Sequence, residues 1–313
     1  MFSVIFPGQG SQFVGMGKEL VQNYHIVKDL FQEADDNFKF SFSDLLINGP
    51  KDALDRTENT QPAIFLIGYA IFKLLKNEYG INLNKAQYFA GHSLGEYTAL
   101  SCSGALNFID TINLLKKRGQ AMQSALPLGE GGMVAILGSK IETIENILNN
   151  NNSKYKCFIA NDNSNVQSVV SGKMKDIDLL IDDLKKNSIK SIKLSVSAPF
   201  HCKYMSKATE IMKKEIENLN LNKPSNKLVS NVSATEVEDL EQIKKLLVDQ
   251  IESRVRWRES IIYMINNKVT KFIEIGPGKV LNGLIKRIDK NVEVISINNK
   301  EEMSELKKNG IFQ

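Results

Sequence analysis

The stretch at 87–100, QYFAGHSLGEYTAL, places a serine between two glycines where an apolar run passes into a helical pattern. Gly91, Ser93 and Gly95 fit the G-x-S-x-G nucleophile elbow, in which the glycines permit a tight strand-to-helix turn and leave the serine hydroxyl exposed. A glycine-softened turn carrying a surface serine is the alternative. The flanking strand and helix patterns supply the context that an elbow requires, so we expect Ser93 to be a catalytic nucleophile.

A serine nucleophile needs a base, and the chain contains three histidines. His92 directly precedes Ser93, so its side chain should point away from the hydroxyl and line the pocket. His25 lies in a polar helical segment, where a surface position is expected. His201 remains by elimination, although a histidine taken alone is more often structural. Cys202 stands beside it, but adjacent residues rarely face one another, which argues against a thiol nucleophile. No acidic residue is marked out to orient His201, and a main-chain carbonyl could do so instead.

Two further glycine-rich segments do not fit phosphate-binding motifs. PGQGSQ at 7–12 follows a predicted strand, but Phe13 stands where a dinucleotide loop would need its third glycine. GPGK at 276–279 lacks the Ser or Thr and the upstream glycine of a phosphate loop. We interpret the second segment as a structural turn.

The elements that must position these residues follow an α/β pattern. Short apolar runs at 3–6, 88–90, 271–275 and 292–297 alternate with glycine-containing turns and helical patterns, which predicts a mostly parallel sheet. The middle of the chain predicts strands at 133–137, 157–160, 166–170 and 189–196, with helices at 140–149 and 177–186. This β-α-β-β-α-β order is typical of a ferredoxin-like unit. We therefore predict a large domain at 1–127 and 198–313, interrupted by a small domain at 128–197.

Composition limits the class of protein. The 313 residues, 42% of them hydrophobic, suffice for one large domain carrying a smaller one. The net charge of +4 comes from mixed charges, which argues against a nucleic-acid partner and leaves a mildly basic face for an acidic one. The three cysteines form no CxxC pair, so we expect neither disulfides nor a metal site, and a cytoplasmic location. The N-terminus shows no signal peptide, and no apolar run is long enough to cross a membrane, so we expect a soluble protein.

Motifs in the right order over nearly the whole chain resemble those of the malonyl-CoA:acyl carrier protein transacylases of fatty acid synthesis. They are PGQGSQ (7–12), GHSLGEY (91–97), RGQAMQ (118–123), Asn161 with Gln167, APFH (198–201) and EIGPGKV (274–280). The resemblance implies an α/β-hydrolase-like core with a parallel sheet and an inserted ferredoxin-like small domain. It places the active site in the cleft between the two.

The resemblance also implies roles for individual residues. Ser93 would be the acylated nucleophile and His201 its base, with the main-chain carbonyl of Gln250 orienting His201. The backbone N–H groups of Gln9 and Leu94 would form the oxyanion hole, in which each donor typically contributes about 3 to 4 kcal/mol to transition-state stabilisation.

Arg118 is interpreted differently with and without the resemblance. Beside Lys116 and Lys117, the residues alone favour a solvated basic face. The family's arginine at this position instead pairs with the free carboxylate of malonate, a task that suits the planar, permanently charged guanidinium.

Other residues are implied to line the substrate pocket. They are His92, Met122, Asn161 and Phe200. Phe200 would fill the space that a branched methylmalonyl group needs and so favour malonyl.

The implied reaction is ping-pong transfer of a malonyl group from malonyl-CoA to the phosphopantetheine thiol of acyl carrier protein, through a malonyl-seryl intermediate. No cofactor or metal would be bound by the enzyme itself, because phosphopantetheine is carried by the partner. The carrier would be acidic and its binding transient, and the enzyme is expected to be a monomer. An acyl-thioester hydrolase using the same Ser and His, and a catalytically silent scaffold, are the alternatives.

Overall fold

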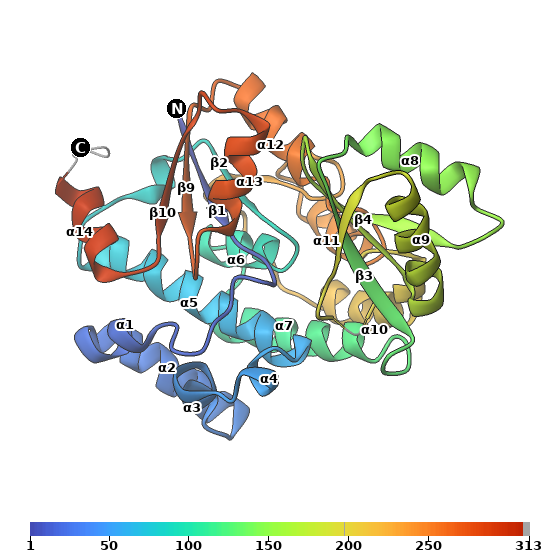
Figure 1. The fold of residues 1–313 in the computed structure, drawn as a ribbon. Helices are drawn as coiled ribbons and strands as arrows, with labels where there is room; N and C mark the ends of the chain where they lie inside the picture. Colours follow the sequence, from blue (N-terminus) through green and yellow to red (C-terminus); the bar gives the residue numbers. More distant parts are fainter. Residues whose placement is uncertain (197, 309–313) are drawn as a thin grey trace.

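The computed structural model describes residues 1–196 and 198–308, and in them the chain forms two β-sheets surrounded by helices (Figure 1). The strands are β1 (Phe2–Phe6), β2 (Tyr88–Gly91), β3 (Gly131–Leu137), β4 (Cys157–Ser164), β5 (Gln167–Lys173), β6 (Lys190–Lys193), β7 (Lys227–Val229), β8 (Glu236–Val237), β9 (Lys271–Ile275) and β10 (Glu293–Ile297). The helices are α1 (Lys18–Asn23), α2 (His25–Phe38), α3 (Phe42–Asn48), α4 (Lys51–Leu54), α5 (Thr57–Asn77), α6 (Gly95–Cys102), α7 (Phe108–Gln123), α8 (Ile141–Asn150), α9 (Met174–Lys186), α10 (Ser206–Glu217), α11 (Leu240–Asp249), α12 (Trp257–Asn266), α13 (Val280–Ile288) and α14 (Lys300–Lys308), with short 3-10 turns η1 (Leu83–Lys85) and η2 (Lys203–Met205).

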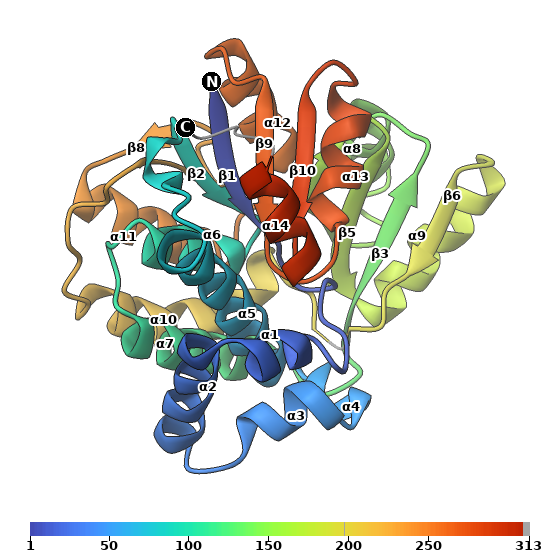
Figure 2. The ribbon, with the colours of Figure 1, turned by 90° about the vertical axis from the view of Figure 1, so that its left-hand side faces the viewer.

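The larger sheet brings together strands from both ends of the chain. Its order is β10-β9-β1-β2-β7-β8, in which neighbouring strands are parallel except for β8, which is antiparallel to β7. Figure 2 shows β2, β1, β9 and β10 side by side, with α1 to α4 gathered at one end of the molecule. Because parallel strands end at the same edge, the loops that follow β1 and β2 meet where α/β proteins bind ligands.

Helices cover both faces of this sheet, which explains the nearly unbroken apolar strands. In β1, Val4 and Phe6 join a core shared with α5 and α6, whereas Ile5 joins a second core with α12 and α13. Burial on both faces is expected for parallel sheets. Helix α5 is buried along most of its 21 residues and lies at the centre of the larger core.

The smaller sheet is antiparallel and has the order β4-β5-β3-β6. One face packs Val134 and Ile136 against apolar side chains of α8 and α9. The other face turns Met133 and Ala135 toward the larger core. Figure 1 shows this arrangement, with β3 and β4 between the two helices and the rest of the molecule.

The predicted α/β architecture, with a parallel sheet and a second small sheet, is confirmed, as is the β-α-β-β-α-β order of the middle segment. The strand predicted at 189–196 is shorter in the structure, where Lys190–Lys193 forms the ladder with β3 and the pairing ends with a hydrogen bond of 2.9 Å from Leu194 N–H to the oxygen of Met133. Strands β7 and β8 were not predicted. Of the predicted domain bounds, residues 197 and 309–313 lie outside the described residues.

Candidate active site

Ser93 lies in the turn between β2 and α6. Its φ is 53°, a left-handed conformation that is uncommon for a residue other than glycine. A Cβ on Gly91 would lie 1.9 Å from the carbonyl carbon of Gly95, and a Cβ on Gly95 would lie 2.3 Å from the carbonyl oxygen of Phe6. The turn is therefore too tight for side chains at either glycine, and this tightness is what a nucleophile elbow requires.

His201 is hydrogen-bonded to the Ser93 hydroxyl, with 2.8 Å between Ser93 Oγ and His201 Nε2. Its other ring nitrogen, Nδ1, lies 2.8 Å from the main-chain oxygen of Gln250. A carbonyl oxygen can only accept, so Nδ1 carries the proton and Nε2 is left to accept the hydroxyl proton of Ser93. The tautomer that a general base needs is thus fixed by the main chain.

The ring of His201 is buried, with 4% of the residue exposed. Burial, together with the positive charge of Arg118, lowers the pKa of His201 to about 3. The imidazole is therefore neutral at pH 7 and able to accept a proton.

Arg118 corrects the interpretation drawn from its neighbours alone. Lys117 on α7 is exposed and pairs with Glu215, but Arg118 is 1% exposed and points into the protein. The reason is helical periodicity, since Arg118 shares the buried face of α7 with Leu114 and Met122, four residues away on either side.

The guanidinium of Arg118 is held by three hydrogen bonds. Nη1 donates to Gln61 Oε1 at 2.8 Å, and Nη2 donates to Gln250 Oε1 at 2.7 Å and to Ser93 Oγ at 3.2 Å. Its Nε is buried without a hydrogen-bond partner among the described residues. A positive charge is thus fixed beside the serine hydroxyl.

A close helix contact brings Gln61 to Arg118. A Cβ on Gly119 of α7 would lie 2.5 Å from the Cα of Glu58 on α5, so glycine is what allows these helices to approach.

Gln9 and Leu94 lie at the two loops that follow β1 and β2. Both line the same cleft as Ser93. Within the described part of the chain, neither backbone N–H has a hydrogen-bond acceptor. The loops touch, because a Cβ on Gly8 would lie 2.6 Å from the carbonyl oxygen of His92. Two residues whose backbone N–H groups have no acceptor therefore line the same cleft as Ser93, and such donors are what an oxyanion hole uses.

The cleft collects nearly every residue that the sequence singled out. Its lining comprises Gln9, Gln61, His92, Ser93, Leu94, Arg118, Met122, Met133, Asn161, Leu194, Val196, Phe200 and His201. Gln250 lies behind it, fully buried. The residues Gln61, Met133, Leu194 and Val196 were not predicted, because nothing in their local sequence distinguishes them from ordinary core positions.

The smaller sheet supplies one wall of the cleft through β4. Asn161 lines the cleft, and Asn163 Oδ1 accepts a hydrogen bond of 2.8 Å from His92 Nε2. The ring of His92 lies 5.6 Å from that of Trp257, centroid to centroid. His92 is therefore occupied by contacts other than the Ser93 hydroxyl.

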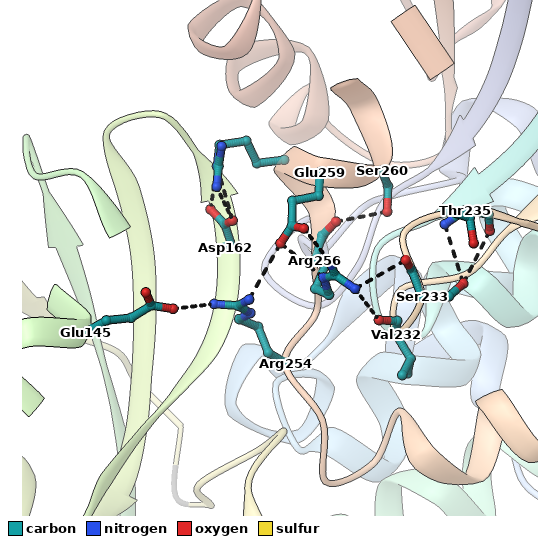
Figure 3. A network of polar contacts seen from close by, with 10 residues as sticks. Glu145, Asp162, Val232, Ser233, Thr235, Arg254, Arg256, Glu259 and Ser260 are labelled. Atoms are coloured by element: carbon teal, nitrogen blue, oxygen red, sulfur yellow. Dashed lines mark hydrogen bonds and ion pairs between the residues drawn. The ribbon is translucent and has the colours of Figure 1, made fainter. Parts of the chain in front are cut away.

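Strand β4 is fixed to the larger part by main-chain and ionic contacts. Val255 N–H donates to the oxygen of Ala160 at 2.8 Å, and Asp162 N–H donates to the oxygen of Val255 at 2.9 Å. The fully buried carboxylate of Asp162 pairs with Arg258 at 2.9 Å. A separate set of ion pairs is shown in Figure 3, where Arg254 lies between Glu145 of α8 and Glu259 of α12.

A thiol nucleophile is not supported by the surroundings of Cys202. Its Sγ donates to the carbonyl oxygen of Pro199 at 3.1 Å, and burial raises the pKa of the thiol. Within residues 1–196 and 198–308, no cluster of three or more His, Cys, Asp or Glu side chains is placed to hold a metal ion. The same residues contain no helix long and apolar enough to span a membrane.

Comparison with known protein families identifies a match to the acyl transferase domain over residues 3–309. The chain is 40% identical over 299 residues to a malonyl CoA-acyl carrier protein transacylase of Bacillus subtilis (strain 168), covering 95% of this chain and 93% of that protein. It is 38% identical over 298 residues to the transacylase of the same name from Haemophilus influenzae, covering 95% of each.

Solved structures agree with these relatives. The acyl-carrier-protein-S-malonyltransferase from Bartonella henselae superposes with a TM-score of 0.95 at 38% identity, covering 98% of both chains. A malonyl-transacylase in complex with its type II PKS acyl-carrier protein superposes with a TM-score of 0.94 at 33% identity, covering 99% of both chains.

Proposed function

This chain belongs to the acyl transferase family, and from that membership and the geometry of its cleft we propose that it transfers a malonyl group from malonyl-CoA to the phosphopantetheine thiol of acyl carrier protein. The observation that carries the proposal is the hydrogen-bonded series Ser93, His201 and Gln250 beside the buried guanidinium of Arg118. It combines an activated nucleophile with a site for a substrate carboxylate.

The first half of the reaction loads Ser93. Its oxygen attacks the thioester carbon of malonyl-CoA as His201 Nε2 accepts the hydroxyl proton. The oxyanion is stabilised by the N–H groups of Gln9 and Leu94. The carbon–sulfur bond then breaks, and His201 returns the proton to the CoA sulfur, leaving a malonyl ester on Ser93.

The second half reverses these steps with a different thiol. The phosphopantetheine sulfur attacks the seryl ester while His201 accepts the thiol proton. The tetrahedral intermediate collapses by breaking the bond to Ser93 Oγ, which regains its proton from His201. The enzyme needs no bound cofactor in either half, because the sulfur that leaves in the first half belongs to CoA and the sulfur that attacks in the second belongs to the carrier.

Arg118 selects the acyl group in this proposal. Its guanidinium binds the free carboxylate of malonate, which an acetyl group lacks. Phe200 limits the space for a branch on the acyl chain, with His92, Met122 and Asn161 completing the pocket wall. Malonyl is therefore favoured over acetyl and methylmalonyl.

We further propose that the chain is divided into two domains and acts as a monomer. Residues 128–197 act as a small domain over the cleft, and 1–127 with 198–313 form the large one. A monomer is sufficient, because all the site residues come from one chain. The excess of 40 Lys and Arg over 36 Asp and Glu suits an acidic carrier. The free cysteines Cys102, Cys157 and Cys202 suit the reducing cytoplasm.

Trapping the intermediate tests the proposal. The purified protein is mixed with malonyl-CoA without carrier, quenched in acid and analysed by peptide mass spectrometry. We expect one malonyl group on the peptide containing Ser93 and none in Ser93→Ala. Adding holo carrier should discharge the ester to malonyl-carrier. Release of free malonate at a rate unaffected by carrier would instead establish the hydrolase alternative.

A further inference from the structure

A group of four buried polar residues lies directly behind the nucleophile and its base. It consists of Glu96, Arg118, Asn231 and Gln250, each no more than 5% exposed, and is called the Glu96 cluster below. Glu96 stands in the first turn of α6, three residues after Ser93, and does not line the cleft. The reaction described above gives its carboxylate no part, although burying a carboxylate is costly unless it is well hydrogen-bonded.

The carboxylate of Glu96 determines which way the Gln250 amide faces. Glu96 Oε2 accepts a hydrogen bond from Gln250 Nε2 at 2.6 Å, while Gln250 Oε1 accepts one from Arg118 Nη2 at 2.7 Å. An ionised carboxylate can only accept and a guanidinium can only donate, so the two ends of the amide cannot be exchanged. The orientation that presents Oε1 to Arg118 thus depends on an acceptor at the Glu96 position.

Gln250 also contacts the base, because its main-chain oxygen accepts from His201 Nδ1. One residue therefore touches both the base and the cation that would receive the malonyl carboxylate. Its Nε2 makes a second bond, of 3.0 Å, to the main-chain oxygen of Ser93.

Glu96 also holds Asn231, which fixes the nucleophile elbow from the other side. Asn231 N–H donates to Glu96 Oε2 at 3.3 Å. The side chain of Asn231 accepts from Ser93 N–H at 2.7 Å and donates to the oxygen of Gly91 at 2.7 Å. Asn231, which is hydrogen-bonded to the elbow, and Gln250, which is hydrogen-bonded to Arg118, both donate to the same carboxylate oxygen of Glu96.

We infer that Glu96 is a positioning residue of the acyl transfer site, whose buried carboxylate holds Gln250 and Asn231 and through Gln250 fixes the guanidinium of Arg118 for the malonyl carboxylate. This role rests on the proposed function, since it assigns the cluster to recognition of a charged acyl group. Glu96 itself touches neither substrate nor base.

The surroundings of Glu96 make its charge sensitive to pH near neutrality. Burial raises the pKa of Glu96 to about 7, against the opposing influence of Gln250, Asn231, Ser230 and Arg118. The phenol of Tyr97 also lies close, but burial raises its pKa to about 12, so it stays neutral. Protonation of Glu96 weakens the acceptor that holds the Gln250 amide. The preference for malonyl over acetyl should therefore decline as the pH falls through about 7.

The test compares loading of Ser93 from malonyl-CoA and from acetyl-CoA in single variants. Glu96→Ala should lower kcat/KM for malonyl by about 10- to 100-fold, mainly through KM, the size expected for losing a hydrogen bond to a charged group. Acetyl loading should fall much less. Gln250→Met, which keeps the main-chain carbonyl and removes the amide, should show the same split.

Two further variants make the test specific. Glu96→Gln replaces the carboxylate by a neutral amide, which imitates the protonated carboxyl, so at every pH it should show the reduced malonyl preference that the wild type reaches below pH 7, without dependence on pH. Glu274→Gln is the matched control, because Glu274 is a fully buried glutamate on β9 that caps α13 through Leu281 and Asn282. Removing the charge of Glu274 should change malonyl and acetyl loading by the same factor.

In the double variant Glu96→Ala with Gln250→Met, kcat/KM for malonyl loading should be no lower than in the less active of the two single variants, because both changes break the same series of contacts. Additive losses, or equal losses on both acyl groups, would overturn the role of Glu96. If Glu96→Ala does not fold, Glu96→Gln and Gln250→Met still decide the question by their acyl preference and pH profiles. Failure of the wild-type protein to load malonyl at all would count against the proposed function. In that case, non-additive changes in unfolding free energy in the double variant would still show that Glu96 and Gln250 are coupled.

Discussion

Arg118→Ala gives the most direct measure of how the cleft selects its acyl group. The guanidinium is fully buried and fixed by Gln61 and Gln250, so little ordering is left to occur when a carboxylate binds. One hydrogen bond to a charged group contributes about 1.5 to 3 kcal/mol net. At about 1.4 kcal/mol for each tenfold change, its loss lowers malonyl loading by roughly 10- to 150-fold, and the loss of a bidentate pair by more.

The assay measures kcat/KM for loading of Ser93 from malonyl-CoA and acetyl-CoA under identical conditions, so that effects on CoA binding cancel in the ratio. The ratio should fall by the factor above in Arg118→Ala, with acetyl loading preserved or improved. Arg118→Lys keeps a charge without the planar fork, so an intermediate ratio is expected. Lys117→Ala is the neighbouring control, since its exposed pair with Glu215 should leave the ratio unchanged.

The substitution also has a structural cost that must be measured separately. Removing Arg118 leaves the buried Oε1 atoms of Gln61 and Gln250 without their donor, at about 1 to 3 kcal/mol each. Urea unfolding gives this loss independently of activity. An equal fall in malonyl and acetyl loading, in a variant that remains folded, would refute Arg118 as the carboxylate site and leave it a structural residue.

Three further predictions concern stability and the elbow. Because the pKa of His201 is lowered to about 3, the unfolded chain binds a proton at this histidine between about pH 3 and 6.5 and the folded protein does not. The unfolding free energy should therefore fall as the pH drops through this window. Urea titrations at pH 7 and pH 5 should show a smaller fall in His201→Gln than in wild type, and equal falls would contradict the lowered pKa. Arg258→Met leaves the fully buried Asp162 unpaired and should cost about 3 to 5 kcal/mol in urea unfolding, with part regained by adding Asp162→Asn; no recovery would mean that the pair is not the cause. Gly91→Ala should abolish soluble expression or Ser93 loading, because its Cβ would lie 1.9 Å from the main chain of Gly95; a fully active Gly91→Ala protein would show that the turn can open.

The parts of the fold that local sequence encodes could be predicted. The turn around Ser93 combines an apolar strand, two glycines and a helical pattern within about ten residues, and the structure contains that strand, turn and helix. Strand β7 was not predicted, because its three residues, Lys227–Val229, are too few to show a periodic pattern. Arg118 looked solvated beside two lysines, although its position on the apolar face of α7, four residues from Leu114 and from Met122, was a readable sign of burial.

The buried network around the site could not be predicted from local patterns. Glu96 and Gln250 are 154 residues apart, and Ser93 and Asn231 are 138 apart. Their hydrogen bonds arise only when the loops after β2 and β7 and the end of α11 meet at one sheet edge. The sequence shows such residues as isolated polar side chains, with nothing to indicate that they share a site.

The attachment of β4 through Val255 makes the cleft mechanically asymmetric. Movement at this edge would break two main-chain hydrogen bonds and a buried ion pair, whereas β6, at the opposite edge of the smaller sheet, is largely exposed. Leu194 and Val196 follow β6 and line the cleft. The wall that carries Asn161 is therefore tied directly to the larger part of the protein, whereas the wall of Leu194 and Val196 is held through the smaller sheet, where Leu194 N–H donates to the oxygen of Met133 at 2.9 Å.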